Sequence, residues 1–312
     1  MNTKATEPGR TKRRWYILVF LAPATLIYTI FAIYPIIESL RLSLYTAGDG
    51  QASFIGIANY LKLLGEPYWA DQFWNAFKNN VVLFIMHMLI QNPIALALAA
   101  LLSIPTLKGT AIYRTVFFLP TLLSVVVVGF IWQLILSPLW GVTPDAMKAL
   151  GLGQWFRPWL GLESSALVTV TLISIWQYVG IPLMLFYAAL LNIPEETLEA
   201  ARIDGLNGWW IFWKVKLPLI LPTLGLVAIL TYIGNFTASF DLIYSIQGGL
   251  AGPDFSTDVM GTFLFRSFFG FQAQLGDQYM GATVASALFF IILAGVGCYL
   301  FGVQRKLQRY DS

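Results

Sequence analysis

The 312 residues carry few charges, because 19 Lys and Arg and 16 Asp and Glu make up only 11% of the chain while 57% is hydrophobic. A soluble domain has about 25% charged residues, so this chain lacks the polar surface that a water-soluble globule of its size needs. The same composition excludes a disordered, collagen-like or coiled-coil protein, and the single cysteine excludes an intrachain disulfide.

The few charges are segregated along the chain, leaving six stretches of 23 to 31 residues with no Asp, Glu, Lys or Arg. A bilayer core needs about 20 largely apolar residues in helix. Lipid offers no partner for backbone amides, so each spanning segment should be helical. We therefore predict an all-α, polytopic membrane protein with six transmembrane helices, over 15–37, 81–103, 116–137, 166–190, 219–241 and 280–302.

The first of these stretches has a second reading as a cleaved signal peptide, because basic residues precede it. Its 23 uncharged residues exceed a signal peptide's apolar region of about 7–15, and no small-x-small cleavage site follows. We expect a retained first span.

The positions of Lys and Arg predict the orientation. With six spans, the two termini and the loops 104–114 and 192–217 lie on one side and hold 13 of these residues, against 6 on the other. The 13-residue side should be cytoplasmic, which gives cytoplasmic tails 1–14 and 305–312 around a membrane domain 15–304. The basic residues then mark topology, and no nucleic-acid partner is expected.

Three longer segments face outward in this arrangement. Residues 38–78 are rich in aromatic side chains typical of a membrane interface, and we predict a short helix lying on the membrane surface at 69–78. Residues 138–163 and 244–277 are rich in Gly, Pro and Trp, and we expect ordered loops there.

The inward loop 192–217 contains start and stop signals for two short helices. Pro194 suits the first helical position, and Glu195 and Glu196 suit the first turn. Gly205 is expected in the left-handed conformation that ends the helix, and Asn207 is expected to cap a second helix. The pattern predicts a projecting helix–turn–helix that suits docking in a groove; the alternative is a solvated connector with an aromatic belt.

Residues in this loop resemble the "EAA" coupling motif of ABC importer permeases. They are Glu199-Ala200-Ala201, Asp204-Gly205, Phe212 and Leu217-Pro218, with one departure at Leu206, where the family more often has Ala. Further segments resemble carbohydrate permeases of the maltose-transporter-F and glycerol-phosphate-transporter-A type. They are Phe54, Gly56 and Asn59-Tyr60; Leu119-Pro120 with Trp132; Gly248-Gly249 through Pro253; and Gly281-Ala282 with Ala285-Ser286-Ala287. The similarity covers about 15–306, and the stretch 249–256 looks longer than the family norm.

The resemblance implies a type I ABC importer permease fold in a bacterial inner membrane, acting in ATP-driven, binding-protein-dependent carbohydrate import. It implies as partners a second homologous permease, two copies of a cytoplasmic ATPase and an extracytoplasmic sugar-binding protein, beside membrane lipid. The coupling helix, with Glu199, Ala200, Ala201, Asp204 and Gly205, would sit in a cleft on the ATPase, where the small alanines permit close approach. The chain has no Gly-x-x-x-x-Gly-Lys-Ser/Thr motif, so ATP and Mg are expected on the ATPase and no cofactor or metal in this chain.

Polar residues within the predicted spans are candidates for a substrate pathway, because such groups are costly in a bilayer. They fall on the fourth and fifth spans, which flank the coupling loop: Ser174, Gln177, Tyr178, Thr231 and Asn235. Members of each set are three or four residues apart and share a helix face. Hydrogen bonding between helices is the alternative role for these residues, and polar packing is the expected role of the lone His87.

Two other classes of function fit the sequence less well. An ion-coupled secondary transporter of a small polar solute would be expected to hold carboxylates within its spans, and the predicted span interiors contain none. A membrane-embedded enzyme would need a nucleophile–base constellation, which the sequence does not present. We expect a transport subunit and no enzymatic activity in this chain.

Overall fold

The computed structural model describes residues 15–48, 51–272 and 275–304, so the two predicted tails lie outside the described residues. The described chain is helical apart from one two-stranded hairpin, β1 (Tyr45–Gly48) with β2 (Gln51–Phe54), which the all-α expectation did not include. The helices are α1 (Trp15–Tyr28), α2 (Tyr34–Leu42), α3 (Ala58–Gly65), α4 (Pro67–Met86), α5 (Asn92–Leu102), α6 (Thr110–Phe118), α7 (Val125–Leu136), α8 (Val142–Ala149), α9 (Glu163–Tyr178), α10 (Gly180–Leu191), α11 (Glu195–Ile203), α12 (Gly208–Ile211), α13 (Leu217–Leu219), α14 (Leu221–Thr237), α15 (Ser239–Gln247), α16 (Met260–Phe269) and α17 (Gln278–Cys298).

Three helical segments of the described chain are continuous, long and apolar enough to cross a membrane: Val19–Leu42, Pro67–Leu102 and Gln278–Gly302. The other three predicted spans overlap bent pairs of helices, and in the fifth, predicted at 219–241, the bend falls at the very start, so that α14 forms most of the span. The bends are 95° between Thr110–Leu122 and Val125–Leu136, 44° between Glu163–Tyr178 and Gly180–Leu191, and 66° between Gly208–Leu219 and Leu221–Thr237. Six crossings by length and composition therefore require that each bent pair counts as one span.

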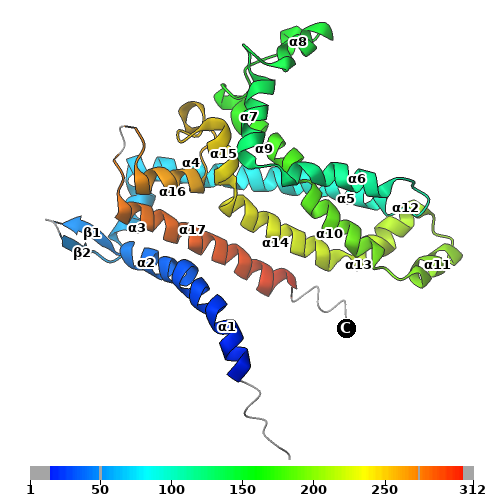
Figure 1. Ribbon diagram of the computed structural model, residues 1–312, viewed down its shortest axis with the longest axis horizontal. Helices are drawn as coiled ribbons and strands as arrows, with labels where there is room; N and C mark the ends of the chain where they lie inside the picture. Colours follow the sequence, from blue (N-terminus) through cyan, green and yellow to red (C-terminus); the bar gives the residue numbers. More distant parts are fainter. Residues whose placement is uncertain (1–14, 49–50, 273–274, 305–312) are drawn as a thin grey trace, which may run out of the picture.

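The predicted surface helix at 69–78 is wrong, because these residues form the first half of α4, which continues without a kink toward α5 (Figure 1). Pro67 begins the helix. The side chains of Asn75, Asn79 and Asn80 donate to backbone carbonyls elsewhere in the chain, so this part of the helix packs against the protein and does not lie alone on the membrane surface. The segments 138–163 and 244–277 also contain helices, α8, α16 and the last turn of α15, where ordered loops were expected.

The sharpest bend lies between α6 and α7, where a 3₁₀ turn at Leu119–Leu122 contains Pro120 and is followed by extended residues Leu123 and Ser124. Pro120 has no N–H and cannot continue the helical ladder. The broken segment is held by α9, because the Thr121 hydroxyl donates to the Gln177 carbonyl at 2.9 Å. A second close approach lies beside it at Gly180, where a β-carbon would come within 2.8 Å of the Phe117 carbonyl oxygen.

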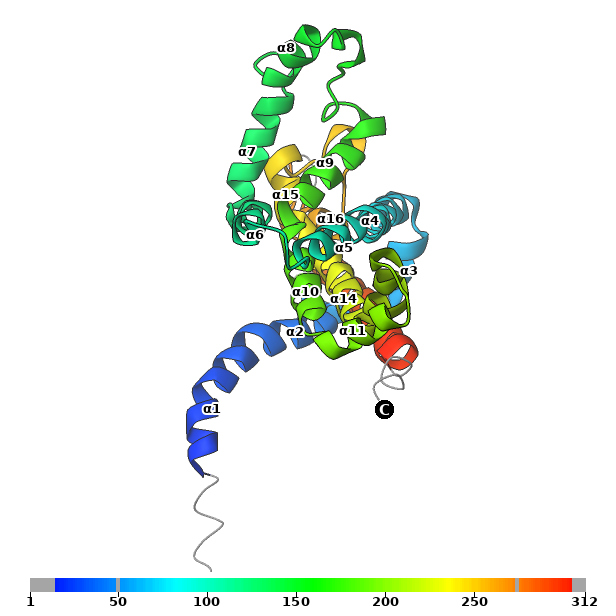
Figure 2. The same cartoon turned by 90° about the vertical axis from the view of Figure 1, so that its right-hand side faces the viewer.

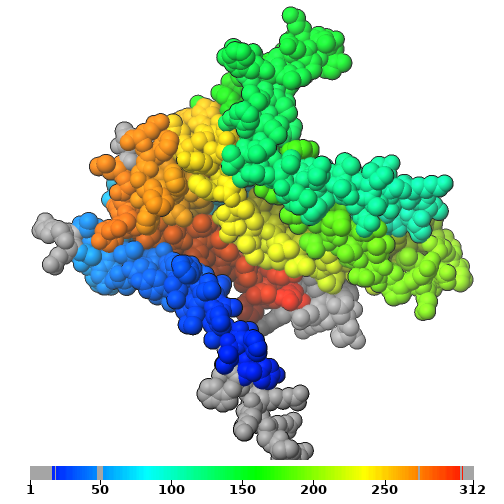
Figure 3. All heavy atoms as spheres, viewed as in Figure 1, coloured from blue at the N-terminus to red at the C-terminus, as the bar shows by residue number. Residues whose placement is uncertain are grey.

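The main body is a bundle in which α5 packs on α10 and α17 packs on α2, α14 and α16. One end of the bundle carries the hairpin, α3 and α16, and the opposite end carries α11 and α12 (Figure 1). Two parts project from the body: α7 with α8 on one side, and α1 on the other (Figures 2 and 3). None of the apolar 18-residue window within Val19–Leu42 is buried by this chain, as expected for a helix surrounded by lipid or by another membrane subunit.

The first span is attached to the bundle at its C-terminal end by the segment that carries the Asn59-Tyr60 motif. The Asn59 amide donates to the carbonyls of Ser43 and Tyr45 at 3.0 and 2.8 Å. The Tyr60 hydroxyl lies 2.8 Å from Ser43 Oγ and 2.7 Å from Ser286 Oγ on α17. The motif therefore joins the end of α2 to the last span.

The buried apolar side chains form three clusters along the bundle. The first, at the hairpin end, includes Trp69, Phe73 and Phe263, and the second, around the α7–α9–α15 contact, includes Val170 and Ile243. The third lies toward the α11 end and contains Leu183, Phe186 and other residues of α5, α10 and α14. A cavity lies where the second and third clusters meet, since both contribute to its largely apolar wall.

Candidate functional site

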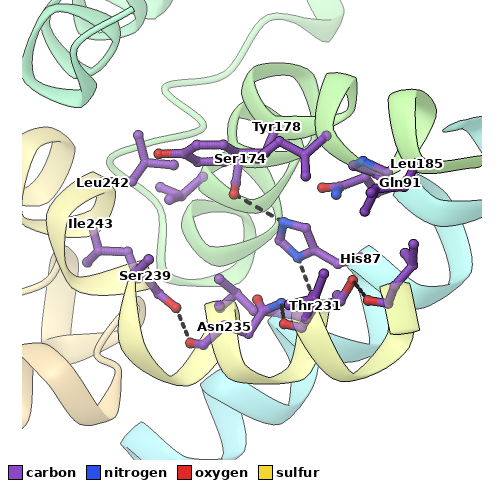
Figure 4. A pocket seen from close by; sticks show the side chains of 18 residues that line it. His87, Gln91, Ser174, Tyr178, Leu185, Thr231, Asn235, Ser239, Leu242 and Ile243 are labelled. Atoms are coloured by element: carbon purple, nitrogen blue, oxygen red, sulfur yellow. Dashed lines mark hydrogen bonds between the residues drawn. The ribbon is translucent and has the colours of Figure 1, made fainter. Parts of the chain in front are cut away.

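The cavity has a volume of about 240 Å³, is partly open, and is lined by residues of α4, α9, α10, α14, α15 and the π-helical turn His87–Gln91, which place several polar side chains in a largely apolar wall (Figure 4). Four of the five predicted pathway residues line it: Ser174 and Tyr178 from α9, and Thr231 and Asn235 from α14. Ser174 and Tyr178 therefore share one helix face, Thr231 and Asn235 share another, and the two faces converge on one space.

Gln177 is not part of the cavity wall. Its side chain is buried and points toward the α6–α7 break, where Nε2 lies 3.4 Å from the Leu123 carbonyl oxygen. Its neighbours Ser174 and Tyr178 face the cavity, and Gln177, one residue from Tyr178 on the helix, faces α6 and α7 instead.

His87 and Gln91 extend the cavity wall beyond the predicted residues. They are the first and last residues of a π-helical turn within the long second span, and such turns are frequent at functional sites. Their separation of four residues, in a stretch without charges, is a spacing that places both on one side of a helix. That spacing was the signal in the sequence that could have placed His87 and Gln91 together in the cavity wall.

His87 and Ser174 form a hydrogen-bonded pair across the cavity wall (Figure 4). His87 Nδ1 lies 2.7 Å from the Leu83 carbonyl oxygen, which can only accept, so Nδ1 carries a proton. In the neutral ring Nε2 is then the acceptor, and the Ser174 hydroxyl donates to it at 3.1 Å. The lone pairs of the Ser174 oxygen remain to accept a hydrogen bond from a molecule in the cavity.

The α14 wall is held by its own hydrogen bonds. Asn235 Nδ2 donates to the Thr231 carbonyl at 2.8 Å, and the Thr231 hydroxyl donates to the Val227 carbonyl at 2.8 Å. The Ser239 hydroxyl donates to the Asn235 carbonyl just past the end of α14. These bonds fix the orientation of the wall that faces the cavity.

Asn80 joins this wall to α16. Its Nδ2 donates to the Asn235 carbonyl at 2.6 Å, and its Oδ1 accepts from the Met260 N–H, at the first residue of α16, at 2.8 Å. Asn80 is 1% exposed, so water does not reach the Asn235 carbonyl or the Met260 N–H at the place where the Asn80 amide bonds them. Asn80 therefore positions the end of α14 relative to α16.

We expect Asn80→Leu to lower the free energy of unfolding by about 2–3 kcal/mol, because it leaves the buried Met260 N–H without a partner. The measurement is unfolding of the detergent-solubilised protein in increasing SDS. Asn75→Leu is the control, since Asn75 lies one turn earlier, is half-buried and makes one bond, to the Phe255 carbonyl at 2.8 Å. Equal stability losses in the two variants would contradict the role assigned to Asn80.

The second candidate site is the turn between α11 and α12, at the end of the bundle (Figure 1). The predicted helix–turn–helix is confirmed: Gly205 has φ +80°, its N–H donates to the Arg202 carbonyl at 3.0 Å, and the Leu206 N–H donates to the Ala201 carbonyl at 3.1 Å. This pair of bonds is the glycine-dependent Schellman ending. Asn207 caps α12 by accepting from the Trp210 N–H at 3.0 Å, whereas Pro194 lies one residue before the helix rather than within it.

The faces of α11 differ in exposure. Glu199, Ala200, Asp204 and Gly205 are exposed, and Ile203 is 86% exposed, which leaves a large apolar side chain in solvent. Ala201 is 6% exposed and packs inward, so a partner approaching α11 would meet Ala200 and Ile203. The expectation that both alanines face a partner is therefore not met by Ala201. The outward face combines apolar and acidic side chains.

Three comparisons with known proteins agree. Residues 91–307 match the family described as "Binding-protein-dependent transport system inner membrane component". A probable ABC transporter permease protein of Bacillus subtilis, YurN, is 35% identical over 86% of this chain and 92% of its own length. The lactose transport system permease protein LacF of Rhizobium radiobacter is 31% identical over 97% of this chain and 99% of its own.

Solved structures of an ABC transporter for import of the acidic polysaccharide alginate contain chains of similar fold. One superimposes with a TM-score of 0.77 over 96% of this chain and 98% of its own, at 22% sequence identity. At that identity the likeness concerns the fold alone. The overall fold of this chain is thus shared with a chain of that transporter.

Proposed function

The chain belongs to the family of binding-protein-dependent transport system inner membrane components, and on that premise we propose that it is the permease subunit of an ATP-driven importer for a carbohydrate. The observation that carries the proposal is the cavity between the helices. Its wall presents hydroxyl, imidazole and amide groups beside Tyr178, and such groups suit a cargo rich in hydroxyls. Relatives named for lactose and for multiple sugars support the same cargo class.

The proposed assembly contains a second, homologous permease, two copies of a cytoplasmic ATPase, and an extracytoplasmic sugar-binding protein, within the bacterial inner membrane. The absence of a phosphate-binding Gly-x-x-x-x-Gly-Lys-Ser/Thr motif from the sequence supports ATP hydrolysis on a separate subunit. This chain would form one half of the translocation pathway, and its two termini would face the cytoplasm.

Coupling to the ATPase would occur through α11, with Glu199, Ala200, Asp204 and Gly205 on its accessible side. A short helix with an exposed apolar residue and flanking charges suits docking into a groove on another protein, and the exposure of Ile203 supports this role. Closure of the ATPase pair would move the helix–turn–helix and, through α12 and α13, the start of α14. The second half of α14 carries Thr231 and Asn235. Cargo contact and ATP-driven movement would thus share one helix.

We expect Asn235→Ala to raise the sugar concentration that half-maximally stimulates ATP hydrolysis by the reconstituted importer, by about three- to tenfold, through loss of one hydrogen-bonding side chain. The measurement is ATPase activity in proteoliposomes containing the binding protein and increasing sugar. Thr237→Val is the control, because Thr237 is exposed near the end of the same helix and bonds only the Ile233 carbonyl. An unchanged half-maximal concentration in Asn235→Ala would remove Asn235 from the pathway.

A further inference from the structure

The cavity wall contains a buried amide without a partner. Gln91 is 5% exposed, lines the cavity, and its Oε1 is fully buried with no hydrogen-bond partner among the described residues. Buried polar side chains in native proteins are almost always hydrogen-bonded to protein or to an ordered molecule. An amide at this position is therefore suited to a hydrogen-bonding molecule in the cavity.

The cavity wall also contains no formal charge: none of its 18 residues is Asp, Glu, Lys or Arg (Figure 4). His87 is engaged on both ring nitrogens, by the Leu83 carbonyl and the Ser174 hydroxyl. The acidic residue closest in sequence to a lining residue is Asp241, which is exposed on α15 and precedes the lining residue Leu242. The part of the wall that this chain contributes offers hydrogen bonds but no counter-charge for an anion.

We propose that Gln91 and the His87–Ser174 pair make this cavity a selective site for an uncharged, hydroxyl-rich cargo, which extends the proposed carbohydrate transport and rests on it. The Gln91 amide and the Ser174 oxygen hydrogen-bond hydroxyls of the cargo. A carboxylated sugar enters the same space without a cation to pair with, and an unpaired charge in a buried site is strongly disfavoured. Neutral sugars are therefore preferred over uronic-acid sugars of the same size by about 100-fold or more.

The test uses the complete membrane complex, with its second permease and ATPase subunits, in lipid nanodiscs and without the binding protein, which would itself bind sugar. Saturation-transfer difference NMR measures weak binding of neutral probes (lactose, raffinose, maltotriose and arabinotriose) and of acidic probes (di- and trigalacturonate). At least one neutral probe binds to the wild-type complex, and neither galacturonate binds at the same concentrations. Binding of a galacturonate within threefold of the best neutral probe would overturn the proposal.

Gln91→Met weakens binding of the neutral probe about tenfold, since it replaces the amide by an apolar side chain of similar length. Gln177→Met is the matched control: it also removes a buried glutamine whose Oε1 has no partner, but one that does not line the cavity, and it changes the dissociation constant less than twofold. Equal effects of the two substitutions would overturn the role of Gln91.

Ser174→Ala provides a second variant of the wall if Gln91→Met fails to assemble with its partners, and it weakens the neutral probe about fivefold. An unchanged dissociation constant in Ser174→Ala contradicts the selective site. Failure of the broader function has a different result: the wild-type complex binds no saccharide of either kind, which removes carbohydrate transport and this site with it.

Discussion

Arg266→Met is expected to lower the free energy of unfolding by about 3–5 kcal/mol, the largest stability effect among the substitutions considered for this chain. Arg266 and Asp258 are 1% and 0% exposed, and their side chains form two hydrogen bonds, of 2.8 and 2.6 Å. The substitution leaves the Asp258 carboxylate buried without its counter-charge. The measurement is unfolding of the solubilised protein, by loss of helical circular dichroism in increasing SDS.

The expected loss has a structural reason beyond the pair itself. The Arg266 guanidinium lies 4.7 Å from the centre of the Phe255 ring and donates to the Gly249 carbonyl at 3.3 Å, so it also holds the segment between α15 and α16. Ala251, Asp254 and Phe255 in that segment have φ between 48° and 55°, a conformation that non-glycine residues adopt only when their surroundings enforce it.

Arg41→Met is the matched control. Arg41 also pairs with a carboxylate, that of Glu38, and also lies over a ring, that of Tyr45, but its side chain is 55% exposed. We expect little change in stability there, because exposed ion pairs contribute little. The double variant Asp258→Leu/Arg266→Met should recover much of the loss by removing both charges. A single Arg266→Met variant as stable as Arg41→Met would contradict this account of the buried pair.

Gly205→Leu is expected to reduce ATP-driven uptake to background while the protein still inserts and assembles with its partners. A leucine at φ +80° costs about 1–2 kcal/mol in backbone conformation, so the turn between α11 and α12 shifts. No atom lies within 4 Å of the place of the new β-carbon, so the effect arises from the turn and from a bulky side chain on the proposed docking surface rather than from a clash within the chain.

Two further substitutions separate these causes. Gly208→Leu places the same side chain three residues away, also in open space but outside the left-handed region, and should retain most uptake. Gly205→Asn should retain more uptake than Gly205→Leu, because asparagine tolerates the left-handed conformation. The measurement is uptake of radiolabelled sugar into proteoliposomes. Full uptake in Gly205→Leu would remove the turn from the coupling mechanism.

The sequence predicted the elements whose determinants are local. The Gly205 turn and the Asn207 cap follow from residue types within a few positions of each other, and both are present. The position of the apolar segments followed from the distribution of charges. Four of the five candidate pathway residues line one cavity, and they could be selected because a hydrophilic side chain is costly inside an apolar helix, so its presence there is informative without any knowledge of the fold.

Features that depend on distant contacts were not predicted. Arg266 was counted only as an outward charge that marks topology. Its ion pair was not predicted, because its partner Asp258 lies before the start of α16 and no helical spacing links the two. The helix at 69–78 was assigned to the membrane surface from its aromatic residues. The contacts that hold it in the bundle join Asn75 and Asn79 to residues 255–258, which are distant in the sequence. The placement of Gln177 outside the cavity depends on the α6–α7 break, which Pro120 alone does not reveal.

Uptake by the reconstituted importer tests the central claim most directly. Proteoliposomes would contain this chain with its second permease and ATPase subunits, and the binding protein and radiolabelled lactose or raffinose would be added outside. We predict that sugar accumulates only when ATP is enclosed and the binding protein is present, and that accumulation survives ionophores that collapse proton and sodium gradients. Accumulation driven by an ion gradient by this chain alone, without ATP or binding protein, would contradict the account.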